Sequence, residues 1–573
     1  MSSSKNIDRI CLAVLIVTLL ATILFMNGEL LGIRAVADED AEYYSGDTRF
    51  TANDLNGDWD TSRAVQITLD GDSASIKGNG AYFNDGTLTI KNGGYYVISG
   101  ELTDGNIEVD AYVSSKVWIL LNGVSINCED NAALSIIKAD KVFLTLVEGT
   151  ENTLTSGETY SDEALEINTN AVIWSKEDLT INGSGSLNVT GSYQHGIKCN
   201  DSLVISGGVI SITCPQDGIH ANDSISFTNA DVTIAAGDDA VHCDTQIYFR
   251  DGSLTVSECY EGLEAPLIEI EGGEIEIHPT DDGINANGGS DAGAFMQGQR
   301  PGMQTQEQSE TGTDTASDQT QILVHITGGS ITIINENGRD ADGIDSNGDI
   351  VIDGGEVFIS LSGTGNNALD YGSENGGNLY LNGGTVVAAG DSSMLEEASG
   401  DSEQANMTIV TSDEMAAGSL VMVSDSDGNI VLEKEISGSF NAVTLSCDGF
   451  AVGGTYTVKI GDNYSEQLTL DTVSVRSGDG TVGFGGAQGR MSGMRQMMGG
   501  QMPEGGQRPE GFGEPESGQM PQMGQRQEDE AGQPAAVQGQ SVSEYPANTW
   551  PLVGASAAVL ILGLVFVLVM KKR

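Results

Sequence analysis

The clearest pattern in the chain is a repeat of apolar and polar residues between His195 and Asn287. Successive windows start at Gly196, Gly218, Ala240, Gly262 and Gly283, at intervals of 22, 22, 22 and 21 residues. Within each window, two short runs alternate apolar with polar residues, as strands with one buried face do. A period of this length is typical of stacked units that bury their apolar faces against one another. The pattern therefore predicts a parallel β-helix.

The same spacing of apolar residues continues on both sides of these windows. Leu179 and Ile181 carry it upstream, and the last clear repeat contains Val386. We therefore expect an all-β chain whose parallel β-helix covers residues 62–400. It should be right-handed, because connections between parallel strands almost always cross over in that sense. Residues 401–476 alternate less regularly and predict a small β-rich C-terminal cap.

Three segments lack this pattern. Residues 38–61 are acidic and only weakly patterned, and they precede the first predicted strands. Residues 288–320 contain few apolar residues and interrupt one repeat, which predicts a disordered insertion. Residues 477–548 are rich in Gly, Gln, Met and Pro, a composition that cannot form a core and favours a disordered linker.

The two ends of the chain contain long apolar runs. Near the start, basic residues precede the apolar run 10–26, and the sequence Ala35-Val36-Ala37 follows it, which predicts a signal peptide over 1–37. An uncleaved anchor is the alternative. Near the end, the apolar run 551–570 precedes three basic residues and predicts a transmembrane helix with a cytoplasmic C-terminus. We therefore expect an exported, single-pass membrane protein whose N-terminal domain is extracellular.

The net charge limits the partners that this chain can have. It contains 83 Asp and Glu against 25 Lys and Arg, for a formal charge of −58. Nucleic acid is excluded as a partner, because binding its phosphates requires the opposite charge. The acidity either keeps the protein in solution or holds bound cations.

The spacing of the acidic residues favours bound cations. Acidic residues recur just before the glycine of each window and again three positions later. Stacked repeats would place these like charges about 5 Å apart, where bare carboxylates repel. Calcium removes the conflict, since it takes six to eight oxygen ligands. The predicted calcium ligands are Asp217, Asp238, Asp239, Glu261, Glu264, Asp281, Asp282, Asp342 and Asp345. A hydrated acidic edge without a specific ion is the alternative.

Two other metal-binding patterns are weaker. The segment 54–60 resembles the start of an EF-hand loop, but Trp59 and Val65 stand where that loop needs Gly and Glu. His220 and His242 share one position in successive repeats and suggest a transition metal. Without a third nitrogen or sulfur ligand on that face, we interpret them as a polar surface pair.

The sequence favours binding over catalysis. A lyase acting on uronates needs Lys or Arg beside the carboxylates, and the repeats from 195 to 390 contain only Lys198, Arg250, Arg300 and Arg339. A carboxylate-pair hydrolase could use Asp217 with Asp238 or Asp239. Acidic residues on every repeat indicate a structural role, however, because a catalytic site occurs once. We therefore expect no enzyme activity, and a polysaccharide lyase is the alternative.

Several segments resemble a clostridial family of calcium-binding, β-helical carbohydrate-binding proteins with a pectate-lyase-like fold. These are VQITLDGDSASIKGNGAYF, TLTIKNGGYYVISGELTDGNIEVDA, DGIHANDSISFTNADVTI, DGINANGG and GGTYTVKIG. The resemblance covers residues 64–471 and implies Ca²⁺-dependent binding of an acidic (pectate-like) or β-glucan (cellulose-like) polysaccharide. We therefore expect a membrane-tethered polysaccharide-binding protein at the cell surface. A pectate-lyase-like enzyme and a structural adhesin that binds a protein partner are the alternatives.

Overall fold

The computed structural model describes residues 49–287, 321–336 and 341–482, and nearly all regular structure in them is β-strand. Helices in these ranges are short. They are η3 (Thr61–Arg63), α2 (Asp162–Glu166) and η5 (Ser373–Asn375).

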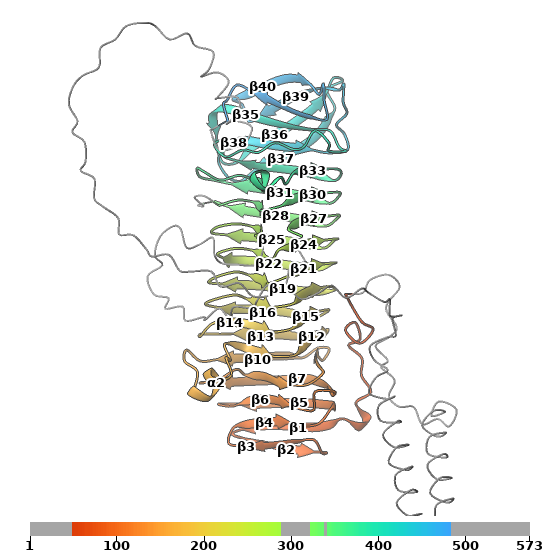
Figure 1. The fold of residues 1–573 in the computed structure, drawn as a ribbon, viewed down its shortest axis with the longest axis vertical. Helices are drawn as coiled ribbons and strands as arrows, with labels where there is room; N and C mark the ends of the chain where they lie inside the picture. The colour runs from red at the N-terminus through yellow and green to blue at the C-terminus, as the bar shows by residue number, and fades with distance from the viewer. Residues whose placement is uncertain (1–48, 288–320, 337–340, 483–573) are drawn as a thin grey trace, which may run out of the picture. The chain divides into compact units, whose positions relative to one another are not determined.

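Most strands belong to three parallel ladders (Figure 1). From β8 onward each ladder strand pairs with the strand three positions later in the chain. The first ladder contains β9 (Lys141–Leu146), β12 (Asp178–Gly183), β15 (Ser202–Ile205), β18 (Ser224–Phe227), β21 (Gln246–Phe249), β24 (Leu267–Ile270), β27 (Leu323–Ile326), β30 (Asp349–Ile352) and β33 (Leu379–Leu381). The second contains β10 (Glu151–Ser156), β13 (Ser186–Thr190), β16 (Val209–Cys214), β19 (Ala230–Ala236), β22 (Gly252–Cys259), β25 (Glu274–Pro279), β28 (Ser330–Asn335), β31 (Glu356–Leu361) and β34 (Thr385–Gly390).

The third ladder contains β4 (Thr87–Ile90), β6 (Asn106–Asp110), β8 (Leu134–Lys138), β11 (Ala171–Ser175), β14 (His195–Cys199), β17 (Ile219–Ala221), β20 (Val241–Cys243), β23 (Leu263–Glu264), β26 (Ile284–Ala286), β29 (Ile344–Ser346) and β32 (Leu369–Tyr371). One strand from each ladder makes one coil of the chain. The first and second ladders join at one end, where β7 (Lys116–Cys128) pairs with β9 through its first half and with β10 through its second. β5 (Gly94–Leu102) pairs along β7, and β1 (Val65–Gly71) along β5.

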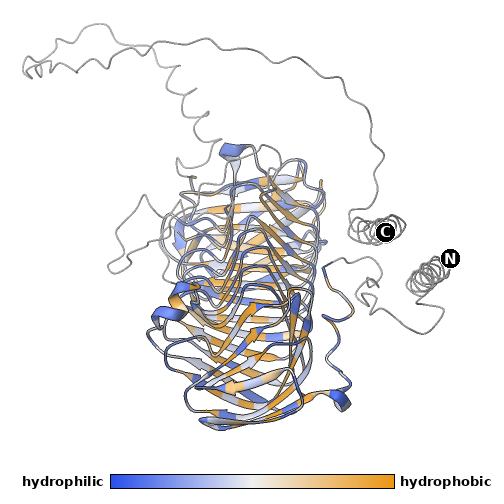
Figure 2. Cartoon of the chain, turned by 60° about the horizontal axis from the view of Figure 1, so that its bottom comes forward, coloured by the Kyte–Doolittle hydropathy of each residue, from blue (hydrophilic) through white to orange (hydrophobic). Residues whose placement is uncertain are grey.

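The 22-residue spacing keeps equivalent apolar residues in line between the ladders. Leu203, Ile225 and Ile247 are direct neighbours in successive strands of the first ladder, and each is fully buried. Figure 2 shows apolar and polar residues alternating along the strands. Burying one such side chain contributes about 1.5–3 kcal/mol relative to leaving it exposed. The alternation predicted from sequence is thus the source of a single continuous core.

Four of the five windows start with glycine, which permits two coils to approach closely, and the fifth starts with Ala240. A Cβ atom on Gly262 would lie 2.2 Å from the carbonyl oxygen of Gly283 and 2.6 Å from Cγ2 of Ile277. Gly196, Gly218, Gly283 and Gly343 have equivalent contacts with the following coil. At these glycine positions a larger side chain would clash unless the neighbouring coil shifts, whereas the coil at Ala240 accommodates a methyl group.

Antiparallel strands close both ends of the stack. At one end, β2 (Ser73–Lys77) pairs with β1 and β3 (Ala81–Asn84) pairs with β4. At the other end, β38 (Phe440–Ser446) pairs antiparallel with both β34 and β35 (Asn406–Met415), and β41 (Ser474–Gly478) pairs with β35. A separate antiparallel sheet contains β36 (Ser419–Asp425), β37 (Ile430–Ile436), β39 (Thr455–Ile460) and β40 (Tyr464–Thr469). Covering strand edges in this way prevents pairing with other chains.

Residues 49–60, here called the strap, lie against the outer face of the first ladder. Phe50 is fully buried with Val204 and Tyr248, and the carboxylate of Asp54 lies 2.8 Å from Nζ of Lys141. At the other end of the strap, Nε1 of Trp59 donates to Oγ1 of Thr145 at 2.9 Å. With the contacts of Trp59 to Trp118 on β7 and of Arg49 to Glu269 on β24 (Leu267–Ile270), the strap contacts strands from β7 to β24.

The described residues confirm a nearly all-β chain with parallel sheets and a β-helix-like arrangement. They correct the predicted localisation. None of their helices is long and apolar enough to cross a membrane, since the longest of the three has five residues and a span needs about 20. The prediction of a single-pass membrane protein is therefore wrong on this finding. The predicted signal peptide (1–37), insertion (288–320) and membrane helix (551–570) lie outside the described residues, as does most of the predicted linker (477–548).

Candidate metal-binding edge

The acidic residues lie at the edge where the second ladder turns into the third. One row of side chains occupies the middle of the third-ladder strands, where Lys198, His220, His242, Glu264, Asn285, Asp345 and Asp370 are direct neighbours in sequence order. A second row precedes it by three residues and contains His195, Asp217, Asp239, Glu261, Asp282, Asp342 and Asn367. Backbone hydrogen bonds hold this second row in line, for example from Gly218 N to Asp239 O at 2.9 Å.

Partners differ along this edge and divide it into two parts. We call His195, Asp217, His220, Asp239, His242, Asp244 and Glu264 the histidine half. We call Glu261, Asp281, Asp282, Asp342, Asp345 and Asp370 the carboxylate half. The first alternates acids with imidazoles, and the second contains acids only.

In the histidine half, Asp217 lies between two imidazoles. Its Oδ2 is 2.7 Å from Nδ1 of His220 and 3.1 Å from Nδ1 of His195. All three side chains are largely buried. Burial acts to raise the pKa of Asp217, but the charges and hydrogen bonds of His195 and His220 hold it well below its usual range. Burial lowers the pKa of His220 to about 4. Asp217 is therefore ionised and fixes the orientation of both rings.

One coil further on the arrangement is reversed, because the imidazole of His242 lies between carboxylates. Its Nδ1 lies 2.6 Å from Oε2 of Glu264 and 3.3 Å from Oδ2 of Asp239, and its Nε2 lies 3.4 Å from Oδ1 of Asp244. Burial opposes ionisation of Glu264, yet the hydrogen bond and charge of His242 lower the pKa of this carboxyl. Burial, with the charges of Asp217 and Glu264, raises the pKa of Asp239 to about 8.

Four acids of the carboxylate half lack such compensation. Within the described ranges, no Lys, Arg or His forms an ion pair with Glu261, Asp282, Asp342 or Asp345. Burial first, and then the charges of neighbouring carboxylates, raise the pKa of Glu261 and of Asp342 to about 9 and that of Asp345 to about 7. The same causes raise the pKa of Asp282 well above its usual range.

Hydrogen-bond donors are few in this half. Nδ2 of Asn285 donates to Oε2 of Glu261 at 2.9 Å, and the backbone N–H of Asp342 donates to Oδ1 of Asp282 at 2.7 Å. The Oδ1 atom of Asn285 is buried and has no hydrogen-bond partner in the described part of the chain. The backbone N–H of Asn367 donates to Oδ1 of Asp342. Carboxylate oxygens that repel one another and have few donors are the ligands that a hard cation such as Ca²⁺ would bind.

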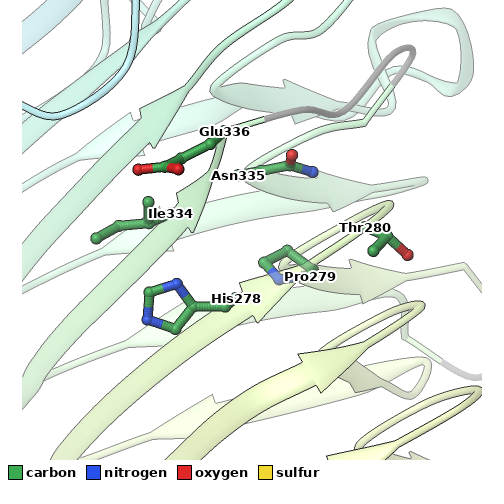
Figure 3. A pocket seen from close by; sticks show the side chains of 6 residues that line it. All are labelled: His278, Pro279, Thr280, Ile334, Asn335 and Glu336. Atoms are coloured by element: carbon green, nitrogen blue, oxygen red, sulfur yellow. The ribbon is translucent and has the colours of Figure 1, made fainter. Parts of the chain in front are cut away.

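A shallow pocket lies beside the carboxylate half (Figure 3). Its volume is about 230 Å³, and it is lined by His278, Pro279, Thr280, Ile334, Asn335 and Glu336. Figure 3 shows His278 and Ile334 side by side on neighbouring strands, with Glu336 beyond them. Thr280 directly precedes Asp281, whose backbone oxygen accepts from Nδ2 of Asn335 at 3.2 Å.

The structure separates the residues that the sequence grouped together. Asp217, Asp239 and Glu264 hydrogen-bond with histidines, whereas Glu261, Asp282, Asp342 and Asp345 face one another. The side chains of Asp238 and Asp281 belong to the same corners, where Tyr260 N donates to Asp238 O at 2.8 Å. The sequence prediction omitted His195, Asp244, Asn285 and Asp370. The row alignment places His195 beside Asp217 and Lys198 beside His220, so it did not show that the rings of His195 and His220 lie with their centres 5.2 Å apart.

The two cationic lyase candidates that the structure describes lie apart. Lys198 neighbours His220 in the third ladder. Arg250 lies at the first ladder, with its guanidinium 4.5 Å from the ring centre of Phe50 in the strap. Arg300 and Arg339 lie outside the described residues.

Parts of this chain are similar in sequence to carbohydrate-binding domain-containing proteins. Residues 84–365 match a family model described as "Carbohydrate-binding domain-containing protein". A protein of that description from Acetivibrio thermocellus is 33% identical over 150 residues, which cover 26% of this chain and 52% of the relative. This chain thus spans about half the length of the relative.

One solved structure, described as the polysaccharide lyase-like protein from C. thermocellum in a gadolinium derivative, is 23% identical with a TM-score of 0.34. The match covers 55% of this chain and 96% of that one. Apart from Asp370, the residues of both halves of the acidic edge lie within residues 84–365, the region that matches the family model.

Proposed function

We propose that this protein binds polysaccharide through calcium held at the carboxylate half, and that it does so without cleaving the chain. The observation that carries the proposal is the group of Glu261, Asp282, Asp342 and Asp345, which are partly buried, raise one another's pKa values through their charges and form no ion pair with a cation in the described ranges. A bound divalent cation would remove the repulsion that raises their pKa values.

The coordination chemistry supports calcium in particular. All candidate ligands are oxygen atoms, from carboxylates and from the Oδ1 of Asn285. Calcium accepts six to eight such ligands in flexible geometry and keeps some positions for water or a ligand. A uronate carboxylate can take one of these positions, so calcium would join an acidic glycan to a protein that carries 58 net negative charges.

The family match supports a carbohydrate as the ligand, and the position of the pocket suggests where a sugar would lie. The pocket at His278 and Glu336 adjoins the carboxylate half and offers polar side chains around an apolar floor of Pro279 and Ile334. We further propose that the three ladders form a right-handed parallel β-helix, which presents one long face to an extended polymer.

The test uses the full-length protein and a sedimentation assay with insoluble polygalacturonate and with cellulose. We expect polygalacturonate binding in calcium and its loss in chelator. The double variant Asp282→Asn, Asp342→Asn should lose binding in calcium as well. The matched control is Glu274→Gln with Glu356→Gln, two exposed acids on the second ladder at aligned positions.

Other outcomes would assign the protein differently. Formation of unsaturated, ultraviolet-absorbing products would show a lyase. Binding to neither polysaccharide, with or without calcium, would contradict the proposal and leave an adhesin for a protein partner. Equal binding of polygalacturonate by the wild type and by the Asp282, Asp342 variant would show that the calcium site lies elsewhere in the protein.

A further inference from the structure

The histidine half contains a second kind of ligand set. His220 and His242 are neighbours in the third ladder, and their rings are stacked with centres 4.6 Å apart and planes 16° apart. Asp244 follows two residues after His242, with its Oδ1 3.4 Å from His242 Nε2. One ligand atom from each of the three residues lies within 4.8 Å of the other two.

Buried carboxylates orient both rings. Asp217 contacts His220 Nδ1 at 2.7 Å, and Glu264 contacts His242 Nδ1 at 2.6 Å. A carboxylate can only accept from an imidazole N–H, so Nδ1 carries the hydrogen in both rings. The Nε2 atom of His242 faces Asp244 at 3.4 Å, and a metal bound between these two atoms would replace the hydrogen there. Histidine ligands of metals are typically held by a carboxylate on the other ring nitrogen in this way.

The composition of this set differs from that of the carboxylate half. Two imidazole nitrogens and one carboxylate suit zinc and other divalent transition metals, whereas calcium takes oxygen ligands. His242 is 8% exposed, and Asp244 is exposed at the mouth of the set. Lys198 occupies the neighbouring position on the other side of His220, so the ligand set extends toward Asp244 only.

We propose that His220, His242 and Asp244 bind a divalent transition metal such as Zn²⁺, with Asp217 and Glu264 as positioning residues. The Nε2 atoms of the two histidines and a carboxylate oxygen of Asp244 are the ligands. Three protein ligands leave a coordination position for water or for an oxygen of a bound molecule. The site is separate from the carboxylate half and does not depend on the proposed calcium function.

The test is a calorimetric titration of full-length protein with Zn²⁺ while calcium is in excess, together with the visible absorption of the Co²⁺-loaded protein. We expect His220→Gln with His242→Gln to remove one equivalent of bound zinc and the Co²⁺ absorption bands. Asp244→Asn should weaken binding, and Glu264→Ala should weaken it about 10- to 100-fold. Glu264→Gln should restore part of this loss, because an amide oxygen still accepts from Nδ1.

The matched control is His278→Gln, which removes an exposed histidine of the second ladder. It should leave zinc binding and the Co²⁺ spectrum unchanged. Circular dichroism and thermal unfolding establish that each variant is folded. An unchanged number of zinc equivalents in the folded double histidine variant would overturn the proposal, as would complete displacement of zinc by calcium.

Discussion

At the residue scale, the most unusual side chain outside the acidic edge is Asp54. It is 1% exposed and contacts Lys141 at 2.8 Å, and it accepts from Oγ1 of Thr180 at 2.5 Å and from Thr51 N at 2.9 Å. The segment 54–60 resembles the start of a calcium loop in sequence, but its first acid, Asp54, forms a buried ion pair with Lys141 of β9. Asp54 therefore holds the strap in place.

We expect Asp54→Asn to destabilise the protein by about 3 kcal/mol, because it leaves Lys141 buried without its counter-charge. Burial acts to raise the pKa of Asp54, but Lys141 and the hydrogen bonds lower it. A lowered pKa gives stability that is present above the unfolded value and is lost as the pH falls through the folded value. Denaturant unfolding should therefore show a difference at pH 7 that shrinks below about pH 4. Asp58→Asn, an exposed neighbour, is the control.

The raised pKa values of the carboxylate half predict the opposite pH dependence in chelator. Glu261 and Asp342, with pKa values of about 9, favour the folded state when protonated. Their contribution is complete below about pH 4 and is lost as the pH rises toward 9. Thermal unfolding in chelator should show a loss of the order of 2 kcal/mol between pH 5 and 9. The variant Glu261→Gln, Asp342→Asn should flatten this dependence, and parallel curves would contradict the assignment.

At the element scale, the sequence predicted the strands well and the partners of the side chains poorly. Alternating residues such as Ile225 and Phe227 indicate a strand because burial requires a period of two, and the 22-residue spacing aligns successive strands. The spacing also predicted the row that contains His220, His242 and Glu264. It could not show which carboxylate bonds to which imidazole, because contacts such as His220 to Asp217 depend on side-chain rotamers across two rows.

The role of a glycine that starts a window can be tested by substitution. We expect Gly262→Ala to destabilise the protein by about 1–3 kcal/mol, the usual cost of overpacking, because its Cβ would meet a carbonyl oxygen at 2.2 Å. Gly400→Ala is the control, since nothing lies within 4 Å of its Cβ and its backbone does not need glycine. Equal melting temperatures for the two variants would show that the coils can move apart at no cost.

At the scale of the whole molecule, the strap connects coils that are otherwise related only through their neighbours. Arg49 Nη2 lies 2.5 Å from Oε2 of Glu269 on β24, and its guanidinium is 3.8 Å from the ring centre of Tyr248. Trp59 packs against Trp118 of β7, with ring centres 5.7 Å apart. A single segment of about twelve residues therefore touches strands from β7 to β24.

This connection changes how the stack should come apart. Coils that contact only their neighbours can detach one by one from an end, since their stability is a sum of local terms. The strap contacts many coils, so none of these coils can unfold without breaking its contacts with the strap. We expect hydrogen exchange in β9 to β24 to occur in one cooperative opening. In the variant Phe50→Ala, Trp59→Ala, the hydrogen-exchange rates should differ from coil to coil in a graded way. The strands β27 to β33 lie beyond the strap contacts described above, and their exchange rates should not change.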